Sequence, residues 1–101
     1  MRIIKESRLR EYAKTHSRAA SSLQHWHNAV RAADWKSLAD LKATFSSADQ
    51  ITLPKCKVTV FNIGGGAFRL ITVIHYNRKI IYIRRLLTHA EYSKEDWKND
   101  P

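Results

Sequence analysis

The first half of the chain carries apolar and partly apolar residues at the spacing of amphipathic helices. From residue 6 onward they recur at i, i+3, i+4 and i+7, so that each set lies on one helix face. The sets are Leu9, Tyr12, Ala13 and His16, then Leu23, Trp26, His27 and Val30, then Leu38, Leu41 and Phe45. Ser17 and Asp34 precede the second and third sets and are suited to cap helix N-termini. The pattern predicts three helices between residues 6 and 46.

The second half of the chain is rich in Val, Ile, Thr, Tyr and Phe, which is typical of strands. Three such runs follow one another: KVTVFNI at 57–63, FRLITVIHY at 68–76 and KIIYIRRLLTH at 79–89. The short connections GGGA and NR between them are suited to hairpins. Residues 46–56 contain Pro54 and several turn formers, so we expect a loop there. MRIIK at 1–5 predicts a first strand, and residues 94–99 predict a short last helix capped by Ser93.

This order of elements predicts an α+β fold. We expect the helices to pack on one face of a mostly antiparallel sheet of about four strands and the opposite face to be free. At 101 residues the chain is long enough to bury one core without disulfides. We therefore expect a single domain that covers residues 1–101.

Alternation along the strands predicts which side chains reach the free face. In the last strand Arg85 is expected on the same face as Ile83, while Arg84 lies on the free face with Leu86. Arg69 is flanked by apolar residues in its own strand, so its guanidinium needs a partner or a solvated cleft. We expect four cations from neighbouring strands to converge on one concavity: Lys55, Lys57, Arg69 and Arg84.

The chain is strongly basic. Eighteen Lys and Arg against nine Asp and Glu leave a formal net charge of +9. Such a charge favours a polyanion as partner, and nucleic acid is the leading class. Scattered basic charge without a function and an acidic protein partner are the alternatives. No basic run adjoins an amphipathic helix and no apolar stretch is long enough for a membrane span, so we expect a cytoplasmic protein without a membrane partner.

The sequence offers little for metal binding or nucleophilic catalysis. Cys56 is the single cysteine, and no HExxH or repeated Cys/His spacing occurs. His25 and His27 are two residues apart on one helix, so they point in different directions. The GGG run at 64–66 joins two strands and lacks the Lys-Ser/Thr of a phosphate loop, so a tight turn is the better interpretation. We expect no metal site and no cofactor.

Polar residue types surround the end of the last strand. They are Lys57, Arg69, Arg84, His89 and Tyr92, with Glu91 and Lys94 beside them. RNA supplies its own nucleophile, the 2′-hydroxyl, so an enzyme that cuts it needs a base, an acid and cations. Histidine suits proton transfer, arginine binds phosphate bidentately and tyrosine stacks on bases. These residue types fit either a phosphodiester site or a polar strand end followed by a solvated turn.

FNIGGGAFRL at 61–70, followed by IYIRRLLTHAEYSK at 81–94, resembles the paired motifs of HigB-type toxins. These are RelE-superfamily mRNA interferases of bacterial toxin–antitoxin modules. The helical part, with Leu23, Trp26 and ADW at 33–35, is similar to that family as well, so the resemblance covers essentially the whole chain. It implies a RelE-like fold, metal-independent cleavage of mRNA on the translating ribosome, and neutralisation by a HigA-type helix-turn-helix antitoxin. Operator DNA would be contacted only through that antitoxin.

The resemblance also assigns roles to residues. His89 would be the general acid or base, Arg69 and Arg84 would bind the scissile phosphate, and Tyr92 would orient the substrate or stack on a base. The RNA-binding cations expected around them are Lys55, Lys57, Lys94 and Arg85. The chain departs from the family pattern at Gly66, where the family usually has Asn, and at Arg85, where it usually has an apolar residue.

Two further hypotheses remain open from the sequence. The first is a basic nucleic-acid-binding module without catalysis, or a toxin attenuated by these two departures. The second is an interaction protein whose basic face binds an acidic partner. The first predicts salt-dependent binding with the RNA recovered intact, and the second predicts negligible RNA affinity.

Overall fold

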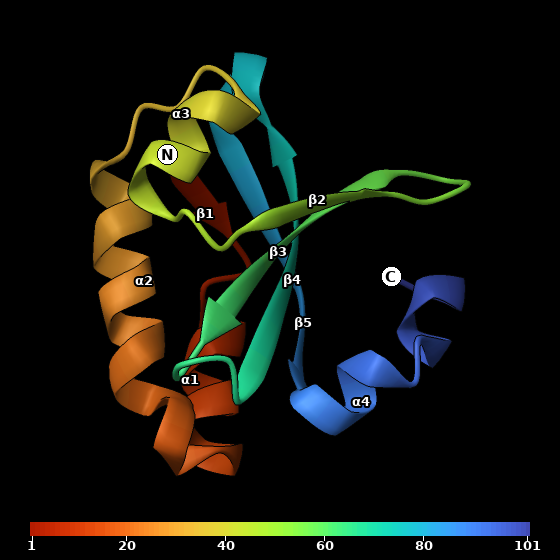
Figure 1. Cartoon of the computed structure of the whole chain (residues 1–101). Coiled ribbons are helices and arrows are strands. Elements are labelled where there is room, and N and C mark those ends of the chain that lie inside the picture. Colours follow the sequence, from red (N-terminus) through yellow and green to blue (C-terminus); the bar gives the residue numbers. More distant parts are fainter.

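The predicted first strand, three helices and three later strands follow one another in the predicted order, with one further strand between the helices and the later strands (Figure 1). The computed structural model describes residues 1–101, and its fold is α+β as predicted. The helices are α1 (Ser7–Thr15), α2 (Ala20–Ala32), α3 (Leu38–Thr44) and α4 (His89–Ser93), with 3₁₀ turns η1 (Ser17–Ala19), η2 (Tyr76–Arg78) and η3 (Asp96–Asn99). The strands are β1 (Arg2–Ile4), β2 (Asp49–Thr52), β3 (Lys57–Ile63), β4 (Phe68–His75) and β5 (Ile80–Thr88). None of the helices has the length and apolar content needed to cross a membrane.

The strands form one mixed sheet in the order β1-β5-β4-β3-β2. β1 runs parallel to β5, and all other neighbours are antiparallel. The sheet has one strand more than predicted, because residues 49–52 form β2 where we expected a loop. Asp49 pairs with Val60 and Thr52 pairs with Lys57, and Pro54 lies in the turn that follows. β2 is an edge strand with only one partly buried side chain, so its apolar pattern is weak.

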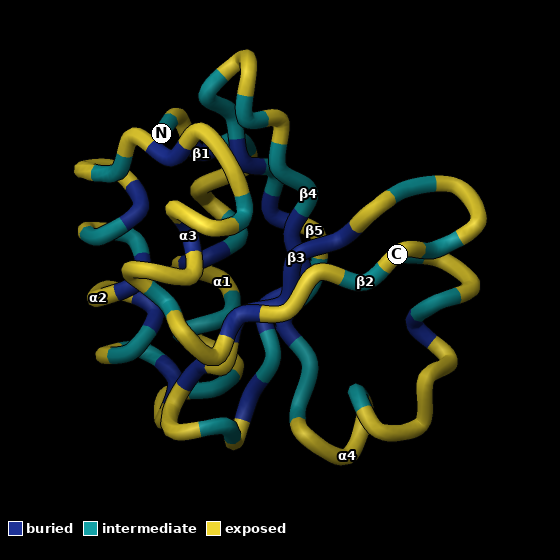
Figure 2. Tube along the Cα trace, turned by 45° about the horizontal axis from the view of Figure 1, so that its top comes forward, coloured by how far each residue is buried: buried dark blue, intermediate teal, exposed yellow.

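The main core lies between the sheet and the helices α1, α2 and α3, which cover one of its faces (Figures 1 and 2). Trp26 of α2 packs edge-on against Phe61 of β3, with 5.4 Å between the ring centroids. Leu70 of β4 and Ile81 and Ile83 of β5 are fully buried beside them. Burial of each such side chain stabilises the fold by about 1.5–3 kcal/mol.

Two of the predicted helix starts are wrong. α3 begins after Ser37, whose hydroxyl accepts a hydrogen bond from the backbone N–H of Asp40 at 3.4 Å. Asp34, the predicted cap, instead bonds Nζ of Lys79 at 2.5 Å, and this bond holds the pKa of its carboxyl below its usual range. Ser17 starts the 3₁₀ turn η1, and α2 follows this turn without a side-chain cap.

The face of the sheet away from the helices is partly covered, whereas we expected it to be free. α4 and η3, which replace the predicted helix at 94–99, fold back over this face on the side opposite to α2 (Figure 1). Trp97 of η3 is only 6% exposed, and it packs with Val58, Val60 and Ile71 in a second apolar cluster. The chain after β5 is thereby held against the sheet.

A β-bulge at Arg84 shifts the alternation of β5. The β4 partners on either side of it are the consecutive residues Ile71 and Thr72, so Arg84 is left without a partner. Beyond the bulge the side chains change faces. Leu86 enters the main core, and Arg85 lies opposite Ile71, which belongs to the second cluster. The predicted faces of Arg85 and Leu86 are therefore wrong.

Candidate active site

The pairing of β4 with β5 brings an arginine, a histidine and a tyrosine together at one end of the sheet. Phe68 at the start of β4 pairs with Thr88 at the end of β5, so Arg69 lies beside the start of α4. Nη2 of Arg69 lies 3.5 Å from Nδ1 of His89, and its guanidinium carbon lies 5.5 Å from the ring centre of Tyr92. A guanidinium only donates, so Nδ1 of His89 is the acceptor in this contact. Three of the four predicted catalytic residues are neighbours.

The turn between β3 and β4 holds Arg69 and the start of α4. Nη1 of Arg69 donates to the carbonyl oxygens of Gly66 and Phe68, and the N–H of His89 donates to the carbonyl of Ala67 at 3.0 Å. The glycines at 64–66 all have positive φ, which confirms the predicted tight turn. Gly66 has φ +96°, and a Cβ there would lie 3.5 Å from Nη1 of Arg69. This departure from the family pattern therefore adjoins the candidate catalytic arginine.

Tyr92 lies between Arg69 and a residue that the sequence reasoning missed, Trp97. The rings of Tyr92 and Trp97 are stacked, with 5.3 Å between their centroids and 18° between their planes. The indole N–H of Trp97 also donates to the carbonyl oxygen of Tyr92 at 3.1 Å. The positive charge of the Arg69 guanidinium is attracted to the electron-rich face of the Tyr92 ring. The signal in the sequence was a lone tryptophan in the polar stretch KEDWKND, which needs an apolar surface to cover it.

A capping box fixes the start of α4 at the end of β5. The hydroxyl of Thr88 accepts a hydrogen bond from the backbone N–H of Glu91 at 3.2 Å. The Glu91 carboxylate accepts one from the backbone N–H of Thr88 at 2.9 Å. The hydrogen bond from the Thr88 N–H lowers the pKa of Glu91 below its usual 4.5. This box orients the first turn of α4, which carries His89 and Tyr92.

Replacing Glu91 by glutamine should lower the free energy of unfolding by about 0.3–1 kcal/mol near neutral pH. A carboxyl whose pKa is lower in the folded chain stabilises the fold above its ordinary pKa and loses this contribution as the pH falls through its folded pKa. The difference between the wild type and Glu91→Gln should therefore shrink below pH 4.5. Urea denaturation at a series of pH values measures it, and a difference independent of pH would contradict this role of the Glu91 charge.

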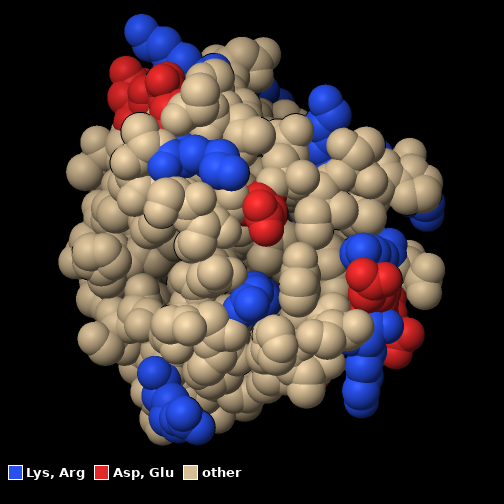
Figure 3. Space-filling view, viewed as in Figure 1, with Lys and Arg blue, Asp and Glu red and all other residues tan.

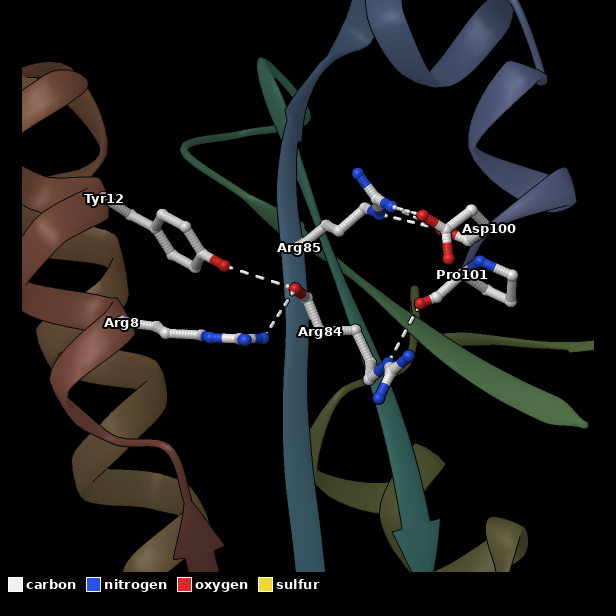
Figure 4. A network of polar contacts seen from close by, with 6 residues as sticks. All are labelled: Arg8, Tyr12, Arg84, Arg85, Asp100 and Pro101. Carbon is white, nitrogen blue, oxygen red and sulfur yellow. Dashed lines mark hydrogen bonds and ion pairs between the residues drawn. The ribbon is translucent and has the colours of Figure 1, made fainter.

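The bulge in β5 places Arg84 and Arg85 on the side of the strand away from α1 (Figure 4). Nε of Arg84 donates to the main-chain oxygen of Pro101 at 2.9 Å. Arg85 donates through Nε and Nη2 to the carbonyl oxygen of Asp100, at 3.0 and 2.6 Å, and through Nη2 to the Asp100 carboxylate at 2.8 Å. The predicted phosphate ligand Arg84 thus contacts the last residues of the chain, and no hydrogen bond joins it to Arg69.

The predicted lysines are spread more widely than we expected. Lys57 lies five residues along β3 from Asn62, the partner of Arg69, which separates these backbone positions by about 16 Å. Lys55 lies in the turn between β2 and β3. The expected convergence of four cations is therefore wrong. Lys94 directly follows α4 and is exposed, on the same short segment as the candidate site.

The surface charge is distributed rather than gathered. On the face seen in Figure 3 the Lys and Arg side chains stand apart among uncharged ones, some of them beside acidic side chains. No group of three or more His, Cys, Asp and Glu side chains is placed to hold a metal ion. The chemistry that the site offers is that of His89 for proton transfer, Arg69 for binding an anion and Tyr92 for holding the Arg69 guanidinium.

Comparison with known proteins places this geometry in a family. Residues 19–95 match the model of the HigB toxin family, described as the RelE-like toxic component of a toxin–antitoxin system. The mRNA interferase toxin HigB of Escherichia coli K12 is 29% identical over 92 residues, which cover 91% of this chain and 88% of the relative. The mRNA interferase HigB of Escherichia coli O6:H1 is 24% identical over 94 residues, which cover 93% and 90%. The resemblance carried by FNIGGGAFRL and IYIRRLLTHAEYSK is thus confirmed, and the chain belongs to the HigB family of RelE-like toxins.

Proposed function

We propose that this chain is an endoribonuclease that cleaves mRNA as the toxin of a toxin–antitoxin module. The observation that carries the proposal is the contact of Arg69 with His89 and Tyr92 at the end of the β4–β5 pair. The names of the relatives, which are mRNA interferases, support the substrate. We further propose that cleavage takes place on the translating ribosome in the cytoplasm, and that a HigA-type antitoxin neutralises the toxin and links it to operator DNA.

In the proposed reaction the RNA supplies its own nucleophile. The 2′-hydroxyl attacks the adjacent phosphorus and the bond from phosphorus to the 5′-oxygen breaks, which leaves a 2′,3′-cyclic phosphate and a 5′-hydroxyl. His89 performs one of the two proton transfers, either from the attacking hydroxyl or to the leaving oxygen. Arg69 binds the phosphate and stabilises the charge that builds up on it. Tyr92 orients the substrate through its contact with the Arg69 guanidinium. Arg84 and the predicted lysines bind the backbone further along.

No step of this reaction requires a metal ion, so a chelator provides a first test. We expect the purified chain to cut RNA at the same rate with and without EDTA. The products should carry 5′-hydroxyl and cyclic-phosphate ends, which enzymatic end-labelling distinguishes from the 5′-phosphates of most metal-dependent nucleases. Loss of cleavage in the chelator would contradict the proposed reaction.

The cellular test is induction of the chain in bacteria, with growth and mRNA 5′ ends followed together. We expect growth arrest and new 5′-hydroxyl ends inside translated messages. Translation inhibitors that empty ribosomes of mRNA should suppress these ends if cleavage depends on the ribosome. Arrest without new ends, or intact messages without arrest, would favour a binding protein without catalysis.

A further inference from the structure

The tandem arginines at the β5 bulge already bind an anionic group of the chain itself. Arg85 donates to both the carboxylate and the carbonyl oxygen of Asp100, and Arg84 donates to the main-chain oxygen of Pro101 (Figure 4). A bulge is needed for this arrangement, because in a regular strand two successive side chains point to opposite faces. The structure therefore directs both guanidinium groups to the same short segment, Arg85 to the carboxylate and main-chain oxygen of Asp100 and Arg84 to the main-chain oxygen of Pro101.

The backbone under this arginine pair is held by α1. Nη1 of Arg8 donates to the carbonyl oxygens of Ile83 and Arg84 at 3.0 and 3.1 Å, and the hydroxyl of Tyr12 donates to that of Arg84 at 3.4 Å. β1 pairs with β5 only as far as Tyr82, so these carbonyls would otherwise face solvent at an open strand edge. The hydrogen bonds from Arg8 and Tyr12 thus hold the backbone of the bulge in place, and with it the positions from which the side chains of Arg84 and Arg85 extend.

The arginine pair lines a cleft that has more basic than acidic side chains in its wall. The cleft has a volume of about 600 Å³; Lys5 and Arg8 add positive charge to it, and Glu91 and Asp100 add negative charge. Arg85 and Arg69 are diagonal neighbours on one face of the β4–β5 pair, because Arg85 lies opposite Ile71 and Arg69 lies opposite Leu87. Diagonal neighbours have side-chain origins about 7–8 Å apart, a gap that neighbouring phosphates of one strand can span.

The ion pair between Arg85 and Asp100, in the wall of the cleft, is exposed to solvent. The side chain of Asp100 is 87% accessible and that of Arg85 is 40% accessible. Exposed ion pairs contribute little to stability because water screens both partners. A ligand that carries a stronger or repeated negative charge can therefore displace the Asp100 carboxylate without unfolding the sheet.

We propose that Arg84 and Arg85 form a second phosphate-binding subsite, for the RNA phosphate next to the one that is cut, and that Asp100 competes with RNA for it. This inference rests on the proposed function, since that function supplies the RNA. A phosphodiester is favoured over an acidic peptide because Arg85 and Arg69 are diagonal neighbours on one sheet face, a spacing that suits successive phosphates of one strand. Asp100 then lowers RNA affinity in the free toxin.

The test compares RNA binding of Asp100→Asn with that of a matched control, Glu95→Gln. Glu95 lies on the same segment and its removal changes the net charge equally, but it pairs with Lys98 at 3.0 Å and has no hydrogen bond to either arginine. The probe is a fluorescent single-stranded 2′-O-methyl RNA, which binds but has no free 2′-hydroxyl and is not cut. Binding is measured by anisotropy at fixed salt, because the affinity depends on ionic strength.

We expect Asp100→Asn to bind the probe about two- to fivefold more tightly than Glu95→Gln, the range that an exposed ion pair corresponds to. Arg85→Gln should bind more weakly than the wild type, and adding Asp100→Asn to it should bring no further gain. Equal binding by Asp100→Asn and Glu95→Gln would overturn the subsite. So would a larger gain in affinity for an oligo-aspartate peptide than for the RNA probe.

The two proposals fail in different ways in these experiments. A wild type that leaves RNA intact, combined with an Asp100→Asn variant that binds the probe more tightly, would refute the catalytic function and keep the subsite. A wild type that cuts RNA, combined with an Asp100→Asn variant that matches its control in binding, would refute the subsite and keep the function. Circular dichroism of each variant verifies that the fold is retained.

Discussion

Replacing His89 by alanine is expected to lower the rate of RNA cleavage by about 10²–10⁴-fold, the contribution that a positioned general acid or base makes. Arg69→Ala is expected to lower it by about 10²–10³-fold, because a fixed donor to the charged phosphate is lost. His89 is exposed at the start of α4, so its removal leaves the core intact. The rates are measured with purified protein by the appearance of new 5′-hydroxyl ends.

The control for both variants is His25→Ala. His25 is an exposed histidine on α2, and no hydrogen bond joins its side chain to the rest of the fold. It should cleave RNA at the wild-type rate, and all three variants should unfold at similar urea concentrations. If a folded His89→Ala or Arg69→Ala protein cut RNA undiminished, the assignment of the site at the β4–β5 end would be wrong.

The main elements of the fold could be predicted because they follow regular periods. α2 carries apolar residues at helical spacing, and β3 and β4 are rich in apolar residues over most of their length. The sequence therefore predicted correctly which of these segments are helical and which are strands. β2 could not be found in this way, because an exposed four-residue edge strand has almost no apolar face. Asp34 and Ser37 are both good N-caps, and only the tertiary pairing of Asp34 with Lys79 decides between them.

The residues of the candidate site were named from the sequence, but only part of their arrangement could be predicted from it. His89 and Tyr92 follow the strand end in the sequence, and Arg69 lies across from that end once the hairpin is in register. The bulge at Arg84 could not be foreseen, because it depends on how β5 pairs with β4 and leaves no mark on the apolar pattern. For the same reason the contacts of Arg84 and Arg85 with Asp100 and Pro101 could not be predicted from the sequence.

Truncation of Trp97 to alanine is expected to cost about 3–5 kcal/mol of the free energy of unfolding, the usual range for a buried tryptophan. It is also expected to reduce cleavage, because Trp97 stacks on the ring of Tyr92, which in turn contacts Arg69. The indole fills the second apolar cluster, and its loss would uncover Val60 and Ile71. Tyr92 would lose the stacked ring and the N–H donor that hold it against Arg69.

Trp97→Phe separates these two effects. A phenylalanine keeps an aromatic ring to stack on Tyr92 and to cover the cluster, but it has no N–H to donate to the Tyr92 carbonyl, which should cost about 1 kcal/mol. We expect its cleavage rate to stay close to that of the wild type, with Trp97→Ala much slower even at low temperature, where both variants are folded. Equal cleavage by folded Trp97→Ala and wild-type protein would mean that Tyr92 needs no support from behind. The second cluster would then be a purely structural feature, and the geometry of the site would depend on the capping box and the glycine turn alone.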